Sequence, residues 1–583
     1  MYKRIVSGIL SILMVTSSIL VGCGGTENTG SADIPAVTEA ASDEKVTPLK
    51  IAVYAQDCEP DGRLNDPVTK WIEKSLNVEL EVIHTGSNAN WGTQLASLMA
   101  ANDLPDIFLL NDPSKDLSNL IEADQVLCLD DYLDNAVLSS DEESVKAMME
   151  ANRTISGDGK LYTWGMKMGS DSDGTVPTFA NYIRWDLYSQ LGYPEINSYE
   201  ELLDILEQMV ALEPQTESGL KTYALGGWFA EGEVWAMSPI FSLGALSEGK
   251  SYSEGNNFVF QINTSDSQPI EGNMLTNPDS RVWTAVDFFA EAYRRGLLDP
   301  DSFTMTQSMW EEKLNAGQYM FEQYGWEAAA ANNAFNQVEG NTKEFISLPS
   351  LNGKTEGRIE NYASGGRKYC VSKNTKYPEK CIELLDFMTC EENSFILHNG
   401  LEGDLWEYDE NGIPVPTDEY LNSDPSNLDF ILEHGNNMYV HFNGYCSGSY
   451  WEKGKTYMDL WSFSDKANEK KMTTTKKDFI EHYGCESQAE VYAKETEVIL
   501  TNNYYTEPAA DEQMTLYLTN LTSYLYSNLF NMIMLGSESE YDVQKEAFIA
   551  SLDEYHINEI YEFYYNAAID QADEMKKIAS YFE

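Results

Sequence analysis

Aromatic side chains beside glycines and carboxylates are the feature of this sequence best suited to bind a small molecule. Trp228 and Trp235 flank Ala230-Glu231-Gly232, Trp326 ends the run Tyr324-Gly325-Trp326, and Trp91 follows a predicted strand. A sugar ring has apolar C–H faces and a rim of hydroxyls, so its site needs aromatic faces for stacking and carboxylates or amides for hydrogen bonds. For any single ring, packing in the core is the simpler explanation, but a Trp next to Gly in a predicted loop favours ligand contact at Trp326.

Sequence patterns of catalytic centres are missing. The six histidines form no H-E-x-x-H pair and none lies beside a G-x-S-x-G turn, and segment 448–456 has five residues between its glycines where a phosphate-binding loop has four. The 95 Asp and Glu residues supply carboxylate pairs by chance, so they do not show whether any pair has the ~5–10 Å separation of a glycosidase. The cysteines include no C-x-x-C spacing, and we expect buried thiols with at most one or two disulfides. We therefore predict no catalytic residue, no metal site and no cofactor.

The charge of the chain excludes one large class of partner. With 38 Lys and Arg against 95 Asp and Glu, the 583 residues have a formal net charge of −57, and such a surface repels the phosphates of nucleic acids. Hydrophobic residues make up 42% and aromatic residues 12%, which is too much apolar material for a disordered acidic protein. A folded body is therefore expected.

The first 47 residues are predicted to export and tether this body. Two basic residues precede the uncharged apolar stretch 5–21, and Leu20-Val21-Gly22-Cys23 is similar to the lipobox of bacterial lipoproteins, whose cysteine is diacylated. We predict a signal peptide over 1–22, lipidation at Cys23 and a flexible tether over 23–47. An uncleaved membrane anchor is the alternative, although ~20 apolar residues are normally needed to span a bilayer. Both arrangements place the body on the extracellular face of the cell membrane.

The first part of the body alternates strands and helices in an order that positions loops for a ligand. A β-α-β-α-β order implies parallel strands with right-handed crossovers, and ligands of such sheets bind beyond the carboxyl ends of the strands. Apolar patterns predict these elements over 49–54, 68–76, 78–83, 91–99 and 106–110. The carboxyl ends of the strands are then followed by loops 55–66, 84–90 and 111–114.

A second α/β region follows the polar run 169–174. It opens with segment 182–188, and Ser198 and Glu201 have the spacing of a capping box at the start of a helix. Further helical patterns cover 282–293, 530–535, 541–552 and 557–579.

Several segments match one known family in order along nearly the whole mature chain. The most specific segment is Leu95-Ala96-Ser97-Leu98-Met99-Ala100-Ala101-Asn102-Asp103-Leu104-Pro105-Asp106-Ile107. Weaker matches are the lipobox, Tyr182-Ile183-Arg184-Trp185-Asp186-Leu187, segment 369–374 before Pro378-Glu379-Lys380, Gly400-Leu401-Glu402-Gly403 with Trp406, and Gly536 before 557–561. In these segments the sequence resembles the extracellular solute-binding proteins of family 1, the carbohydrate-binding lipoproteins of bacterial ABC importers.

The resemblance implies an α/β protein with a type II periplasmic-binding-protein-like fold. Each of two lobes would be a mainly parallel sheet flanked by helices, with the ligand in the cleft between the lobes. Lobe one would comprise 48–168 and 345–410, and lobe two 169–344 and 411–583. Hinge closure around a carbohydrate, expected to be an oligosaccharide, would report occupancy to the permease subunits of an ABC transporter. The protein would be a monomer that meets the membrane through its lipid anchor alone.

The same resemblance assigns residues to the binding site. Asp112 stands where family members often hydrogen-bond a sugar, and Trp326 stands where they stack on one. An acidic sugar would need a cation, for which Arg63, Arg184 and Arg367 are candidates, although a structural role is the simpler explanation for each. Weaker candidates for ligand contact are Asn65, Asp66, Trp91, Asn111, Trp228, Ser364, Gly365, Gly366 and Tyr445.

Two other functions remain open from the sequence. A secreted glycoside hydrolase would also be acidic and rich in Trp, but a single barrel would show eight strand-helix units, and this chain does not. A surface glycan sensor or adhesin on the same scaffold would share every feature named above, because sensing and transport use the same closure.

Overall fold

The computed structural model describes residues 45–579 apart from short internal segments. The segments outside the description are 57–61, 86–90, 111–112, 134–142, 169–178, 233, 249–258, 264–267, 350, 352–353, 358–366, 426 and 501–507. The predicted signal peptide, Cys23 and most of the predicted tether also lie outside the described residues. Within the described part, no helix has both the length and the apolar character needed to cross a bilayer.

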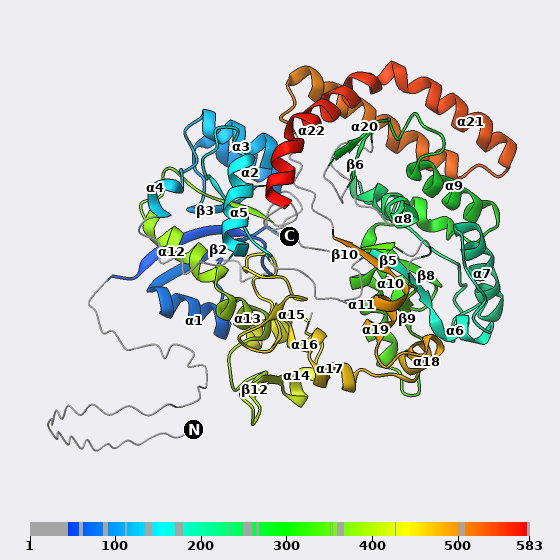
Figure 1. The fold of residues 1–583 in the computed structure, drawn as a ribbon, viewed down its shortest axis with the longest axis horizontal. Coiled ribbons are helices and arrows are strands. Elements are labelled where there is room, and N and C mark those ends of the chain that lie inside the picture. The colour runs from blue at the N-terminus through cyan, green and yellow to red at the C-terminus, as the bar shows by residue number, and fades with distance from the viewer. Residues whose placement is uncertain are drawn as a thin grey trace, which may run out of the picture. The chain divides into compact units, whose positions relative to one another are not determined.

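The first sheet has five strands in the order β2-β1-β3-β11-β4. β1 (Thr47–Val53) pairs in parallel with β2 (Val78–His84) and with β3 (Ile107–Leu109), which confirms the order predicted from the sequence (Figure 1). β11 (Lys368–Val371) pairs antiparallel with β3 and with β4 (Thr163–Gly165), so the sheet is mixed. β11 comes from a distant part of the chain, and a local apolar pattern does not show such a pairing.

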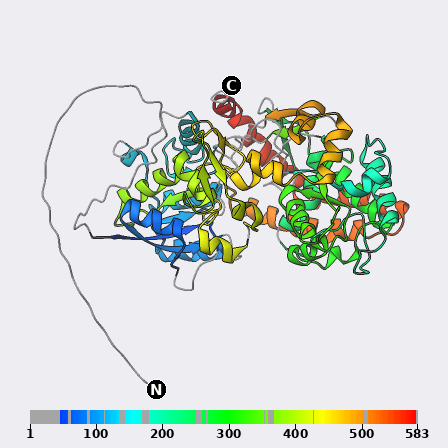
Figure 2. The same cartoon turned by 90° about the horizontal axis from the view of Figure 1, so that it is seen from below.

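Helices flank this sheet and connect its parallel strands. α1 (Pro67–Leu76) begins at Asp66, whose carboxylate accepts a hydrogen bond from the backbone N–H of Thr69. α2 (Trp91–Ala101) leads into β3, and α12 (Pro378–Thr389) packs beside α1 (Figure 2).

The second sheet has three strands in the order β8-β5-β9. β8 (Phe321–Tyr324), α11 (Gly325–Asn336) and β9 (Phe345–Ser347) form a β-α-β unit whose strands lie on either side of β5 (Phe179–Arg184) (Figure 1). β5 is antiparallel to both neighbours, so this sheet differs from the mainly parallel one expected. The reason is that β5, from an earlier part of the chain, inserts between the two strands of the unit in the opposite direction.

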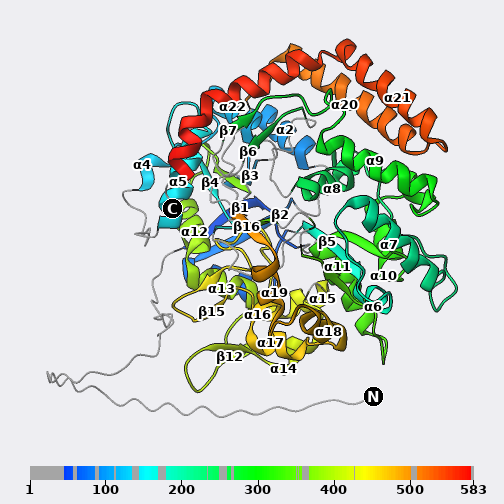
Figure 3. The same cartoon turned by 45° about the vertical axis from the view of Figure 1, so that its right-hand side comes forward.

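The helices around the second sheet contribute to a large hydrophobic core. α7 (Tyr199–Leu212) starts at Ser198, whose hydroxyl accepts the backbone N–H of Glu201 as the capping-box spacing predicted. α9 (Arg281–Arg294) follows the predicted pattern, and three further helices pack into the same core. These are α20 (Glu512–Ile533), which is longer than the pattern over 530–535 predicted, α21 (Glu538–Ser551) and α22 (Ile557–Ala579) (Figure 3).

The remaining described elements are shorter connections, hairpins and surface helices. They are α3 (Pro113–Glu122), α4 (Asp130–Leu133), α5 (Glu143–Thr154), α6 (Trp185–Gln190), η1 (Val234–Met237), α8 (Ser238–Glu248), β6 (Gln261–Asn263), β7 (Gln268–Ile270), η2 (Pro300–Phe303), α10 (Gln307–Asn315), β10 (Lys354–Gly357), α13 (Glu391–Asn399), β12 (Trp406–Tyr408), β13 (Pro414–Pro416), α14 (Asp418–Asn422), α15 (Leu428–His434), β14 (Tyr450–Trp451), β15 (Thr456–Tyr457), α16 (Leu460–Phe463), α17 (Asp465–Lys470), α18 (Thr474–Tyr483), α19 (Gln488–Glu495), β16 (Glu497–Leu500) and η3 (Leu552–Tyr555).

The six cysteines of the described residues form no disulfide with one another. The sequence allowed for at most one or two disulfides, and none lies among these six. Cys58 and Cys23 lie outside the described residues.

Candidate ligand-binding site

Four aromatic rings meet at the second sheet, around the junction between β8 and α11. We call Phe179, Trp235, Tyr324 and Trp326 the aromatic platform. The ring of Trp326 meets the ring of Phe179 edge to face at 5.5 Å and that of Tyr324 at 4.8 Å, and Trp235 lies 6.1 Å from Tyr324. Trp235 and Trp326 are 39% and 41% exposed, so both indoles have surface left for a ligand.

Buried rings support the platform from below. Trp228 is only 1% exposed and stacks on Trp235 at 5.8 Å, and its edge meets Trp310 at 4.7 Å. The indole N–H of Trp228 donates to the backbone oxygen of Trp235 at 3.0 Å. Because the supporting ring is itself fixed, the exposed indole of Trp235 rests on a rigid base.

A chain of hydrogen bonds joins the two exposed indoles. The Trp326 indole N–H donates to Oε1 of Glu327 at 3.0 Å, and the side-chain amide of Gln307 donates to the same oxygen at 2.8 Å. Oε1 of Gln307 accepts the indole N–H of Trp235 at 2.7 Å, while the Gln307 backbone N–H donates to Glu231 at 2.7 Å. The polar edge of each indole is thereby satisfied, and the orientation of each ring is fixed before any ligand arrives.

Two carboxyl groups with raised pKa values, Glu327 in this chain and Glu311 bonded to it, accompany the two indoles. Burial raises the pKa of Glu327 to about 7, and the charge of Glu311 adds to the effect. Burial also raises the pKa of Glu311, with a further contribution from the charge of Glu231. A carboxyl group that ionises near neutral pH can donate as well as accept hydrogen bonds, so the hydrogen bonds around Glu327 depend on pH.

A second aromatic group lies at the carboxyl end of β1 in the first sheet. The guanidinium carbon of Arg367 is 4.7 Å from the ring centroid of Tyr54, and His441 meets that ring edge to face at 4.5 Å. The hydroxyl of Tyr369 on β11 donates to the backbone oxygen of His441 at 3.0 Å. These contacts bring together an exposed cation and two rings at the sheet edge where ligands of α/β folds bind.

The described part of the chain shows no metal centre. No group of three or more His, Cys, Asp or Glu side chains among those residues is arranged to hold a metal ion.

Residues 68–401, more than half of the chain, match the family model described as bacterial extracellular solute-binding protein. The chain belongs to this family. Its members are transport components, and no enzyme family is indicated for this solute-binding protein.

Solved structures of solute-binding proteins share the fold. The Streptococcus pneumoniae ABC-transporter substrate binding protein FusA, in complex with kestose, is 14% identical with a TM-score of 0.61 over 91% of this chain and 100% of that chain. The alginate-binding protein AlgQ2, without calcium ion, is 15% identical with a TM-score of 0.57 over 90% and 98% of the two chains. The N-glycan transport solute binding protein NgtS of Streptococcus pneumoniae, with Man5GlcNAc, is 15% identical with a TM-score of 0.52 over 91% and 99%. At these identities the similarity establishes the fold, which confirms the predicted α/β architecture of two-lobed binding proteins.

No protein with a curated function matches the sequence of this solute-binding protein.

The structure gives structural roles to several residues that the sequence nominated for ligand contact. Trp91 is 3% exposed and its indole N–H donates to the backbone oxygen of Leu109 at 3.1 Å. Asp66 is buried as the N-cap of α1, and Trp228 supports the platform without reaching its surface. Tyr445 is buried, with its backbone oxygen 2.9 Å from Nε2 of His398.

The other nominated residues are exposed, form ion pairs, or lie outside the described part of the chain. Asn65 is exposed beside the start of α1. Arg184 is buried and bonded to Asp186 and Glu213, and Arg63 pairs with Glu79, so both have structural partners. The nominated residues outside the described part are Asn111, Asp112, Ser364, Gly365, Gly366 and Cys23.

Of the nominated residues, Trp326 is the one that lies among exposed rings in the structure. Its hydrogen-bonding partners were not identified from the sequence. Glu327 follows it directly, so a carboxylate beside a loop Trp was a usable signal. Gln307 and Phe179 carry no such signal, because they reach the platform from other elements.

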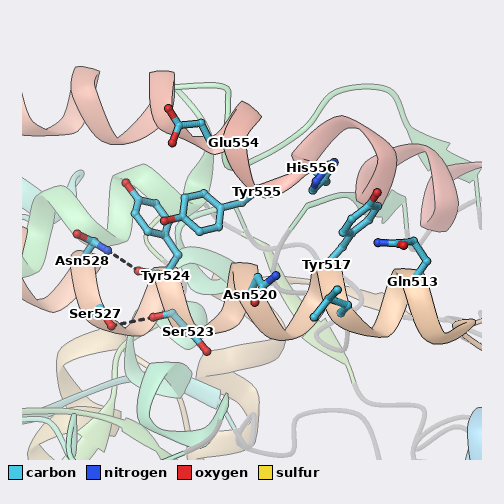
Figure 4. A pocket seen from close by; sticks show the side chains of 11 residues that line it. Gln513, Tyr517, Asn520, Ser523, Tyr524, Ser527, Asn528, Glu554, Tyr555 and His556 are labelled. Carbon is cyan, nitrogen blue, oxygen red and sulfur yellow. Dashed lines mark hydrogen bonds between the residues drawn. The ribbon is translucent and has the colours of Figure 1, made fainter.

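A separate groove of about 670 Å³ lies between α20 and the end of η3 (Figure 4). Two stacked ring pairs cross it, Tyr517 with His556 at 3.7 Å and Tyr524 with Tyr555 at 4.0 Å. The side chain of Asn528 donates to the backbone oxygen of Tyr524. Packing between helices accounts for these contacts, and the groove shares no residue with the aromatic platform, so we assign it no ligand.

Proposed function

We propose that this solute-binding protein captures an oligosaccharide and that the aromatic platform is part of its binding site. The observation that carries the proposal is the pair of exposed indoles, Trp235 and Trp326, whose N–H groups are held by Gln307 and Glu327. Fixed aromatic faces with carboxylates at their edges are what a sugar ring requires. FusA and NgtS were solved in complex with kestose and Man5GlcNAc, which are glycans and support this ligand class.

We further propose that the sheet edge of lobe one supplies a second set of contacts. Tyr54, His441 and Arg367 are the described members, and Asp112, with Asn111, Ser364 and Gly365, remains the sequence-based candidate for hydrogen bonds to sugar hydroxyls. Asn65 is retained because it is exposed in a loop that precedes α1.

The proposed lobes follow the sequence boundaries with one adjustment. Lobe one is 48–168 with 345–410, and lobe two is 169–344 with 411–583. Residues 438 and 441 bond to the segment that follows β1, since the backbone N–H of Gln56 donates to the backbone oxygen of Met438 at 2.8 Å and that of His441 donates to the backbone oxygen of Tyr54. These contacts favour extending lobe one beyond residue 441.

We also propose that the protein is a monomer, anchored on the extracellular face of the membrane through lipidated Cys23. In this position it would deliver its ligand to an ABC permease. A glycan sensor on the same scaffold would bind in the same way, and genes for permease subunits beside this one would favour import.

A binding screen tests the proposal. The mature chain, without its first 22 residues, is mixed with neutral and acidic oligosaccharides, thermal unfolding is recorded, and each hit is recovered and analysed by chromatography. A ligand that stabilises the protein and is recovered intact supports binding, and Trp326→Ala should lose it while Tyr450→Ala, a similarly exposed ring on β14, should keep it. A cleaved ligand would establish a hydrolase, and no hit with any sugar would point to peptides or other solutes.

A further inference from the structure

The two exposed indoles of the platform depend on one amide side chain. Gln307, the first residue of α10, accepts the N–H of Trp235 with its oxygen and donates from its nitrogen to Glu327. The accepting oxygen of Glu327 also takes the N–H of Trp326. Since α10 and α11 pack against each other, the spacing between these helices sets the spacing between the two indoles.

A second contact joins the same two helices. The carboxyl groups of Glu311, one turn after Gln307, and Glu327 on α11 are hydrogen-bonded to each other. Two carboxyl groups can share a hydrogen bond only while one of them holds a proton. The contact between α10 and α11 therefore includes a proton that can be lost.

We propose that Gln307, Glu311 and Glu327 are positioning residues that hold Trp235 and Trp326 as one unit, and that release of the proton shared by Glu311 and Glu327 loosens this unit and weakens ligand binding. The part of this inference that concerns ligand affinity rests on the proposed function. The part that concerns the two indoles does not.

The charges around the pair agree with this direction. Glu231, from the loop before η1, adds a negative charge beside Glu311, and Glu322 of β8 is buried close enough for Glu327 to act on it. The charges that most affect the two groups are therefore negative: that of Glu231 on Glu311, and that of Glu311 on Glu327. Loss of the proton leaves two carboxylates in contact, and their charges repel.

The sign of the pH dependence follows from the raised pKa. Burial raises the pKa of Glu327 to about 7, so the shared proton is present below that pH and is lost above it. Repulsion then separates α10, which carries Gln307, from α11, which carries Trp326. We expect the affinity for a glycan to fall as the pH rises through about 7.

Fluorine NMR tests the unit without any ligand. The protein is labelled with 5-fluorotryptophan, and the resonances of Trp235 and Trp326 are assigned with Trp235→Phe and Trp326→Phe. Both resonances should titrate with one common midpoint near pH 7, while the resonance of buried Trp406, on β12, stays constant. Absence of titration, or different midpoints for the two indoles, would overturn the proposal.

Two variants separate positioning from a general structural role. Gln307→Leu should abolish the titration of Trp235, because the link to that indole is cut, and should preserve the titration of Trp326 with a higher midpoint, because the lost amide no longer donates to Glu327. Glu311→Gln is nearly isosteric, and its amide donates to Glu327 at every pH, so the common midpoint should move to lower pH. An unchanged titration in Glu311→Gln, or a Trp235 titration that survives in Gln307→Leu, would contradict the unit.

The effect on affinity is measured with an oligosaccharide identified by the binding screen. Titration calorimetry of the wild-type protein should show a Kd about tenfold weaker one to two pH units above the midpoint than below it, and Glu311→Gln should remove most of this difference. Equal affinities for the wild-type protein on both sides of the midpoint would overturn the inference. Failure of every sugar to bind would instead refute the proposed function, and the fluorine titration would still decide the positioning unit.

Discussion

Removal of the Trp326 side chain should weaken glycan binding and should cost the fold only about half of what removal of a buried Trp costs. About 41% of the side chain is exposed, which for an indole of about 250 Å² leaves about 100 Å² for a ligand to cover. At about 25 cal/mol per Å² this area corresponds to about 2.5 kcal/mol, or nearly a hundredfold in Kd, if the ligand covers all of it. Trp326→Ala should therefore raise the Kd by between about ten- and a hundredfold in titration calorimetry.

The cost of the same change to the fold is set by what the indole contacts in the free protein. Replacing a fully buried Trp by Ala costs about 3–5 kcal/mol, and Trp326 is partly exposed, so we expect about half of that loss in the free energy of unfolding. Trp228→Ala is the matched control, because that ring is 1% exposed and should cost the full amount. Equal losses of stability in the two variants, or an unchanged Kd in Trp326→Ala, would refute the assignment of Trp326 to the ligand surface.

Three further outcomes are expected. Asp66→Ala should cost about 0.5–2 kcal/mol of stability in urea unfolding with the Kd unchanged, because the carboxylate caps α1, and Asp66→Asn should restore most of the loss. Lys368→Met should stabilise the protein by a few kcal/mol near pH 7, because Nζ of Lys368 has no hydrogen-bond partner among the described residues and burial lowers its pKa to about 7. The gain should shrink as the pH approaches the ordinary lysine value of 10.5, where the unfolded chain also loses the proton. A pH-independent gain would argue against this cause. Cys23→Ala should release the protein from the membrane fraction of cells, and its retention there would argue against lipidation.

The site was only partly visible in the sequence, because exposure is a property of the packed structure. Trp91, Trp228 and Trp326 are alike in the sequence as rings near polar residues, yet the first two are buried and the third is exposed. Trp228 is covered because Trp235 stacks over it. A local pattern cannot say which of two neighbouring rings will lie on top.

The partners of the exposed rings were invisible for a related reason. Gln307 reaches Glu327 across 20 positions and Trp235 across 72, so the chain that fixes both indoles joins three separate elements. An isolated Gln at the start of a helix resembles many surface glutamines. Its role exists only because α10 and α11 pack together.

The sequence by itself determined the features that depend on neighbours along the chain. The alternation of strands and helices from β1 to β3, the cap at Ser198 and the family are all encoded by short-range patterns or ordered motifs. Tertiary structure alone decided the antiparallel position of β11, the insertion of β5 between β8 and β9, and the rings that remain exposed. The physical reason is that apolar periodicity determines which face of a segment is buried. The segment that covers this face lies far away in the sequence, and only the packing of the whole molecule determines which segment it is.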